Sequence, residues 1–183
     1  LRRLRVAVWP QRGDGPQRLV VTSPTSVAAA DAVAGNLAVT LALAGWSTLL
    51  AWTERDPAAG GDQGALEGFG SSRSGSPVAG ALGLRSLTVL ALPVGSNATG
   101  TPAERLCARL DALGGVHDVE IIAAPALMRG ADALEASPLS DAMLVVVDLG
   151  AETRDDLDAS VEALDAVGAP VEGIVAYRVP KGW

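Results

Sequence analysis

Short apolar segments alternate with longer helix-like segments along most of this chain of 183 residues. The apolar segments are typical of buried strands and cover residues 18–23, 47–52, 86–92, 118–123, 142–147 and 171–176. Helix patterns lie between most of them, at residues 28–44, 101–113, 126–136 and 153–167. Strands that alternate with helices form a parallel sheet covered on both faces. The sequence therefore predicts a three-layer α/β domain with a mostly parallel sheet.

The composition excludes several classes of function. A net charge of −7 argues against a nucleic-acid binder. Cys107 is the only cysteine and His117 the only histidine, so an internal disulfide and a His-rich metal site are excluded. We expect Cys107 to pack within a helix rather than act as a nucleophile. No apolar stretch is long enough for a membrane span, and the start without Met suggests a piece of a longer protein.

The first strand and the first long helix are joined in the manner of a phosphate-binding loop. Such a loop needs glycines whose N–H groups converge on phosphate, a lysine, and a Ser or Thr hydroxyl for magnesium. The corresponding residues contain neither the glycines nor the lysine. They are Ser26, Val27, Ala28, Ala29, Ala30 and Asp31. Asp31 would also repel a phosphate. The turn is either a degenerate phosphate loop or an ordinary helix start capped by Thr25 or Ser26.

Two longer stretches resemble a known family. Residues 21–45 match VTSPxPGEGKSTxAANLAxxLAxxG on both sides of the turn. Residues 117–179 match YDxVIIDTPPxxxxxDAxxLxxxxDxxLLVVRxGxTxRxxLxxAxxxLxxxGxxVxGVVLNRV. These patterns resemble the cytoplasmic kinase domain of bacterial tyrosine autokinases that accompany chain-length determinants in capsule and exopolysaccharide synthesis. That family belongs to the MinD/ParA-like group of P-loop ATPases, so the resemblance implies a P-loop NTPase-like fold.

The departures from the family patterns lie at the positions that handle nucleotide. Ala123 replaces the aspartate after the fourth predicted strand, and Trp52 replaces the first aspartate of a second acidic motif, in which Glu54 keeps a carboxylate. Tyr177 replaces an asparagine that lies near the nucleotide base in the wider group. Phosphoryl transfer depends on lysine, magnesium and the acids that hold it. The resemblance and its departures together imply a domain with no catalytic residues, no metal and no cofactor.

The remaining carboxylates have simpler interpretations. Asp31, Glu54 and Asp56 could gather at the ligand-binding edge of the sheet and hold a cation, but capping or solvated roles are the simpler expectation. The segment at residues 53–83 is rich in Gly and Ser and predicts a flexible loop. Acidic residues lie at the beginning of the last predicted helix, where the positive end of the helix dipole stabilises their negative charge. They are Asp155, Asp156 and Asp158.

The N-terminus forms a separate region in this interpretation. Residues 1–17 would be an arm, and residues 18–183 the degenerate P-loop domain. Arg2 and Arg5 match the end of the family's EAYRxLRxN segment, which in that family docks onto the next subunit. They are therefore candidate oligomer-interface residues. A membrane-proximal basic stretch attracted to anionic lipid is the other interpretation.

We expect a non-catalytic pseudokinase that acts as a scaffold in a polysaccharide co-polymerase or chain-length-control assembly. The resemblance implies a homo-oligomer at the inner, cytoplasmic face of the plasma membrane. Its partners would be polysaccharide-assembly membrane proteins, reached through segments outside this chain. Two alternatives stay open. One is an unconventional ATP-binding kinase or ATPase that uses Glu54 and Asp56, and the other is a MinD/ParA-like adaptor unrelated to polysaccharide.

Overall fold

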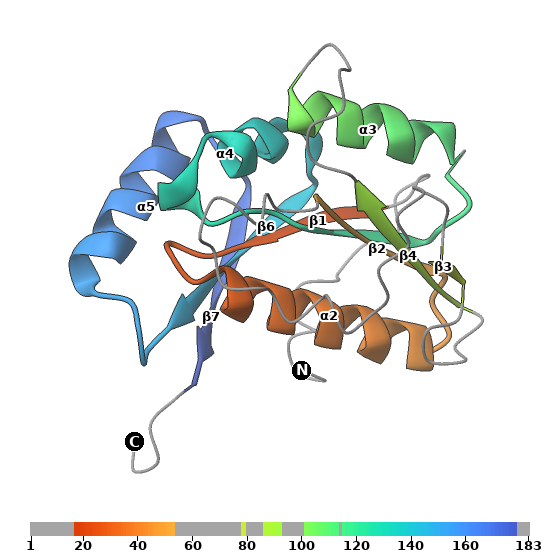
Figure 1. The fold of residues 1–183 in the computed structure, drawn as a ribbon, viewed down its shortest axis with the longest axis horizontal. Helices are drawn as coiled ribbons and strands as arrows, with labels where there is room; N and C mark the ends of the chain where they lie inside the picture. The colour runs from red at the N-terminus through yellow and green to blue at the C-terminus, as the bar shows by residue number, and fades with distance from the viewer. Residues whose placement is uncertain (1–16, 54–77, 80–85, 93–100, 114, 179–183) are drawn as a thin grey trace.

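The centre of the molecule is a seven-stranded sheet (Figure 1). A computed structural model describes residues 17–53, 78–79, 86–92, 101–113 and 115–178. The strands are β1 (Gln17–Thr22), β2 (Thr48–Thr53), β3 (Val78–Ala79), β4 (Leu87–Leu92), β5 (Val119–Ala123), β6 (Ala142–Asp148) and β7 (Val171–Tyr177). Their order is β3-β4-β2-β5-β1-β6-β7, and β3 alone runs antiparallel to its neighbour. The predicted mostly parallel sheet is confirmed.

Helices cover both faces of the sheet. Helix α2 lies on one face, while α3, α4 and α5 lie on the other (Figure 1). The helices are α2 (Val27–Leu43), α3 (Pro102–Ala112), α4 (Asp132–Ala136) and α5 (Arg154–Ala166), with short 3₁₀ turns η3 (Leu127–Arg129) and η4 (Ser137–Leu139). The three-layer α/β fold is therefore confirmed as well.

Two apolar layers separate the sheet from its helices. Alternate residues of each strand point to opposite faces, so Val21 and Ile121 pack toward α2 whereas Val20 and Ile122 pack toward the other helices. The buried face of α2 is rich in alanine, and these small side chains leave room for close packing on the sheet. The buried alanines are Ala29, Ala30, Ala34, Ala38 and Ala42.

One sequence prediction is wrong in detail, and another is tested only in part. The single helix predicted at residues 126–136 is divided into η3 and α4, because the backbone at Gly130 is extended (φ 169°, ψ 175°). The segment predicted as a flexible loop contains the two-residue strand β3, which pairs with β4. Most of that segment lies outside the described residues.

Cys107 and His117 have packing roles in the structure. Cys107 on α3 is half-buried, and burial raises the pKa of its thiol, which makes the nucleophilic thiolate scarcer. His117 is buried, and its Nε2 lies 3.1 Å from the Thr88 hydroxyl. Burial lowers the pKa of His117, which favours the neutral ring. Among the described helices, none is long and apolar enough to cross a membrane.

Candidate functional site

The carboxyl ends of the central strands bring the altered motif positions together. Ala123 at the end of β5 pairs in register with Val21 of β1 on one side and with Trp52 of β2 on the other. The turn that leads from β1 into α2 begins at Ser23, two residues after Val21. This edge is where ligands bind in open α/β sheets. The degenerate loop, Trp52 and Ala123 therefore share the position of the expected nucleotide site.

The turn itself has become the beginning of a helix. Helix α2 starts at Val27, and the N–H groups of Ala29 and Ala30 both donate to the Ser26 carbonyl, at 3.0 and 3.3 Å. Ala29, Ala30 and Asp31 are fully buried. Alanine has the highest helix propensity of all residues, which explains why the helix extends this far toward β1. Four of the positions that would surround a phosphate are thus helical and buried, namely Val27, Ala29, Ala30 and Asp31.

Ser26 stands at the N-cap position, but its side chain does not cap the helix. Its hydroxyl instead donates to Asp148 Oδ2 at 3.1 Å. The Thr25 hydroxyl donates to Glu152 Oε1 at 3.2 Å. The interpretation of the turn as a helix start with Ser26 at the N-cap is therefore confirmed in position, but neither hydroxyl caps the helix. The two polar side chains are directed toward the loop that follows β6.

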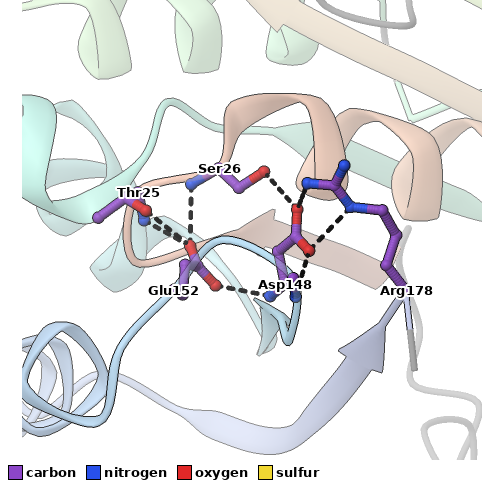
Figure 2. Close-up of polar contacts among 6 residues, drawn as sticks. Thr25, Ser26, Asp148, Glu152 and Arg178 are labelled. Carbon is purple, nitrogen blue, oxygen red and sulfur yellow. Dashed lines mark hydrogen bonds and ion pairs between the residues drawn. The ribbon is translucent and has the colours of Figure 1, made fainter. Parts of the chain in front are cut away.

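A carboxylate from that loop accepts the backbone N–H groups of the turn. Glu152 Oε1 accepts from the N–H of Thr25 at 2.7 Å and from the N–H of Ser26 at 2.9 Å. Glu152 Oε2 accepts from the N–H of Asp148 at 2.6 Å. Figure 2 shows this carboxylate lying between the two loops. Hydrogen bonds to a charged acceptor are about twice as strong as neutral ones.

Asp148, the last residue of β6, is the second carboxylate of this cluster. It is fully buried, and its oxygens accept from the Arg178 guanidinium, the Ser26 hydroxyl and the Gly150 N–H (Figure 2). The hydrogen bonds from Arg178 hold the pKa of the Asp148 carboxyl below its usual value, with the Gly150 and Ser26 bonds adding to the effect. Asp148 is therefore ionised at neutral pH, and its charge is compensated inside the protein.

Arg178 follows β7 directly and has a left-handed backbone, with φ of 50°. That conformation costs a residue with a side chain on the order of 1 kcal/mol. The ion pair with Asp148 and the Nε bond to Oδ1 at 2.9 Å offset this cost. The Arg178 side chain is still 57% exposed, so the cluster opens toward solvent on this side.

The other predicted site residues are placed as follows. Trp52 and Ala123 are buried in the apolar layer beneath α2, together with Ala30. Asp31 is fully buried, so the expectation that it is solvated or caps the helix is wrong. Glu54, Asp56, Arg2 and Arg5 lie outside the described residues. Within the described ranges, no group of three or more His, Cys, Asp or Glu side chains could hold a metal ion.

A small hollow beside the end of β5 is mostly apolar. It is lined by side chains of α3, α4 and β5, among them Leu106, Ile122 and Ala123, and by Asp132. Burial raises the pKa of Asp132, with a further contribution from Glu135. The charge of Arg105 acts on the same carboxyl in the opposite direction.

Sequence reasoning missed Asp148, Glu152 and Arg178 as members of this site. A signal for Asp148 was present, because it occupies the arginine position in the LLVVRxGxTxR part of the family pattern. An acid at a position that otherwise carries a base marks a changed electrostatic role. Glu152 occupies the threonine position of the same pattern, and nothing local indicated that it would reach the first loop.

The comparisons with known proteins give a consistent result. The sequence matches no protein-family model and no curated protein. The chimerical protein CapA2B2 has a similar structure, with a TM-score of 0.70, 25% identity, and coverage of 98% of this chain and 82% of that one. The kinase domain of the Escherichia coli tyrosine kinase ETK matches with a TM-score of 0.67 and 18% identity, over 98% of this chain and 74% of that one. The fold is that of a bacterial tyrosine kinase domain.

Solved structures of the wider MinD/ParA-like group are also similar to this chain. The MinD cell division protein of Aquifex aeolicus matches with a TM-score of 0.62 and 20% identity, over 90% of this chain and 70% of that one. This chain thus has the P-loop NTPase fold that both groups share. The resemblance to tyrosine kinase domains that the sequence indicates is confirmed at the level of the fold.

Proposed function

We propose that this tyrosine-kinase-like chain is a non-catalytic domain that acts as a scaffold. The observation that carries the proposal is the position of Ala30, which stands in place of the phosphate-binding lysine. It is fully buried in the first turns of α2. Ala123 and Trp52, in place of two acids, are buried beside it. A site that has lost its lysine, its acids and its loop conformation lacks the parts that phosphoryl transfer requires.

The biological setting of the proposal follows from the family resemblance. The scaffold would belong to a polysaccharide co-polymerase or chain-length-control assembly at the inner face of the plasma membrane. Residues 18–183 would form the pseudokinase domain, with residues 1–17 as an arm that contacts a neighbouring copy. The fuller structural match to CapA2B2 than to MinD favours this setting over an adaptor of the MinD type.

The first prediction is that ATP with magnesium does not bind with useful affinity. A ligand at one hundred times its dissociation constant stabilises a protein by about 2.7 kcal/mol, which is a clear rise in melting temperature. We expect no rise with millimolar ATP and magnesium, and no heat of binding by calorimetry. Magnesium alone and ATP with a chelator serve as controls.

A rise that requires both ATP and magnesium would overturn the proposal and support the unconventional enzyme that uses Glu54 and Asp56. Steady ATP hydrolysis that follows the protein through size exclusion would do the same. A nucleotide response in the variant Glu54→Ala equal to that of the parent would then exclude Glu54 as a metal ligand.

The second prediction concerns self-association. If residues 1–17 contact a neighbouring copy, the chain should have a mass greater than that of a monomer in light scattering after size exclusion. Charge reversal with Arg2→Glu and Arg5→Glu should shift it toward the monomer, because rim charges direct docking. Arg154→Glu, on the exposed side of α5, is the matched control. A monomeric parent would contradict the arm as an oligomer interface.

A further inference from the structure

The turn between β1 and α2 already holds an anion, and that anion belongs to the chain itself. We propose that Glu152 is an autoinhibitory clamp, whose carboxylate occupies the backbone N–H groups that an external oxyanion would need. The inference goes beyond the scaffold role. It does not depend on polysaccharide or on any partner, because it rests on the contacts of one side chain.

The donors around Glu152 Oε1 have the arrangement of an oxyanion site. The N–H groups of Thr25 and Ser26 are consecutive, precede a helix, and converge on one oxygen at 2.7 and 2.9 Å. The hydroxyl of Thr25 adds a third donor at 3.2 Å. Consecutive N–H groups before a helix are a frequent binding place for phosphate and carboxylate. Here all three donors are used by a single internal carboxylate.

The carboxylate is held in place from its own side as well. The N–H of Glu152 donates to the Asp148 carbonyl at 2.9 Å, while its Oε2 accepts from the Asp148 N–H at 2.6 Å. The main chain and the side chain of Glu152 are thus both bound to one residue. These bonds leave the side chain little rotational freedom. The hydrogen bonds to Thr25 and Ser26 therefore cost little further side-chain entropy.

Asp148 extends the clamp to the rest of the sheet edge. Its carboxylate accepts from the Ser26 hydroxyl and is paired with Arg178 beyond β7. The two carboxylates together connect the β1–α2 turn, the β6–α5 loop and the end of β7 (Figure 2). An external phosphate would have to displace an acceptor that is held within the same molecule, at a high effective concentration.

Nuclear magnetic resonance on the parent chain tests the contact without any mutation. Couplings transmitted through hydrogen bonds should connect the amide nitrogens of Thr25, Ser26 and Asp148 to the side-chain carboxyl carbon of Glu152. Their absence would overturn the clamp if couplings within the helical hydrogen bonds of α2 are measurable in the same sample.

A titration with inorganic phosphate tests the occupancy. The variant Glu152→Ala removes the carboxylate, and Glu162→Ala removes an exposed carboxylate of the same type from the same loop-and-helix unit. At constant ionic strength, the amide signals of Thr25 and Ser26 should move saturably with phosphate in Glu152→Ala only. Its melting temperature should rise in parallel, whereas the parent and Glu162→Ala should show no specific response.

An unresponsive Glu152→Ala that is folded would overturn the proposal, as would a parent that responds equally well. If Glu152→Ala does not fold, Glu152→Gln gives the same decision. Its carboxamide keeps the size but replaces one acceptor oxygen by an N–H₂ donor, so it cannot accept on both sides of the clamp. We then expect faster hydrogen exchange at Thr25, Ser26 or Asp148 than in the parent, and unchanged exchange at all three would overturn the proposal.

Discussion

At the scale of single residues, Asp148 shows how a buried charge is stabilised in this molecule. Its carboxylate accepts hydrogen bonds from Ser26, Gly150 and Arg178, and these bonds replace most of the hydration that the group loses on burial. Removing one partner from a buried ion pair leaves the other charge buried and unpaired. The stability of this edge should therefore depend on Arg178.

The third prediction is that Arg178→Gln lowers the free energy of unfolding at pH 7. We expect a loss of roughly 1–3 kcal/mol, a moderate value because solvent screens the half-exposed guanidinium. Urea unfolding curves for the parent and the variant measure the difference. The control is Arg154→Gln, whose ion pair with Asp158 lies on the surface, and we expect it to change the free energy by less than about 0.5 kcal/mol.

The pH dependence of this difference has a definite sign. Because the pKa of Asp148 is lowered in the folded state, its ionised form contributes stability above the unfolded pKa of about 3.9. That contribution is lost as the pH falls through the folded pKa. The gap between the parent and Arg178→Gln should therefore be largest near neutral pH and should shrink below about pH 4. A gap that stays constant with pH would mean that Arg178 acts through packing rather than charge.

At the scale of elements, α2 is the part that separates this chain from a nucleotide-binding protein. The fourth prediction is that Ala30→Lys, which restores the phosphate-binding lysine alone, destabilises the fold. A lysine at this fully buried position would place its charge among Val33, Val21 and Trp52 of the same apolar layer. We expect a loss of about 2–4 kcal/mol in urea unfolding, since a buried charge without a partner is costly.

The matched control is Asn36→Lys, on the exposed side of the same helix, with an expected change within about 1 kcal/mol. If Ala30→Lys were as stable as Asn36→Lys, the start of α2 would be able to unwind into a loop. Rebuilding the loop more fully with Val27→Gly, Ala29→Gly and Asp31→Ser would then become a reasonable route to ATP binding.

The elements themselves could be predicted from the sequence because their signals are local. The apolar run before Ser23 and the alanine-rich run after Ser26 place β1 and α2 within one or two residues of their observed bounds. The split at Gly130 was missed because its extended backbone interrupts an otherwise helical composition. The Glu152 clamp could not be predicted in this way, since its partners Thr25 and Ser26 are 127 and 126 residues distant in the chain. Only the pairing of β1 with β6 brings them together.

At the scale of the whole molecule, the central strands of the sheet are better shielded from solvent than its edge strand β7. Strands β1 and β5 are paired on both sides and buried, whereas β7 is an edge strand with exposed apolar side chains at Val171 and Ile174. The fifth prediction is that amide hydrogens of β1 and β5 exchange far more slowly than those of β7, because exchange at an edge needs only local opening.

Hydrogen exchange followed by mass spectrometry at two protein concentrations measures this difference. Protection of β7 that increases with concentration would show that another copy covers this edge. Protection of β7 equal to that of β1 at both concentrations would contradict the prediction.

The alanines at the start of α2 also have a consequence for how such a domain can change over generations. The resemblance places glycines at the positions of Val27 and Ala29, and alanine is more stable than glycine in a helix by about 1 kcal/mol. Each exchange away from glycine therefore stabilises the helix, and each reversal weakens it before any affinity for phosphate returns. The stability of the helix therefore favours changes in one direction only. Steps away from the glycines make the helix more stable, whereas each step back toward them lowers that stability.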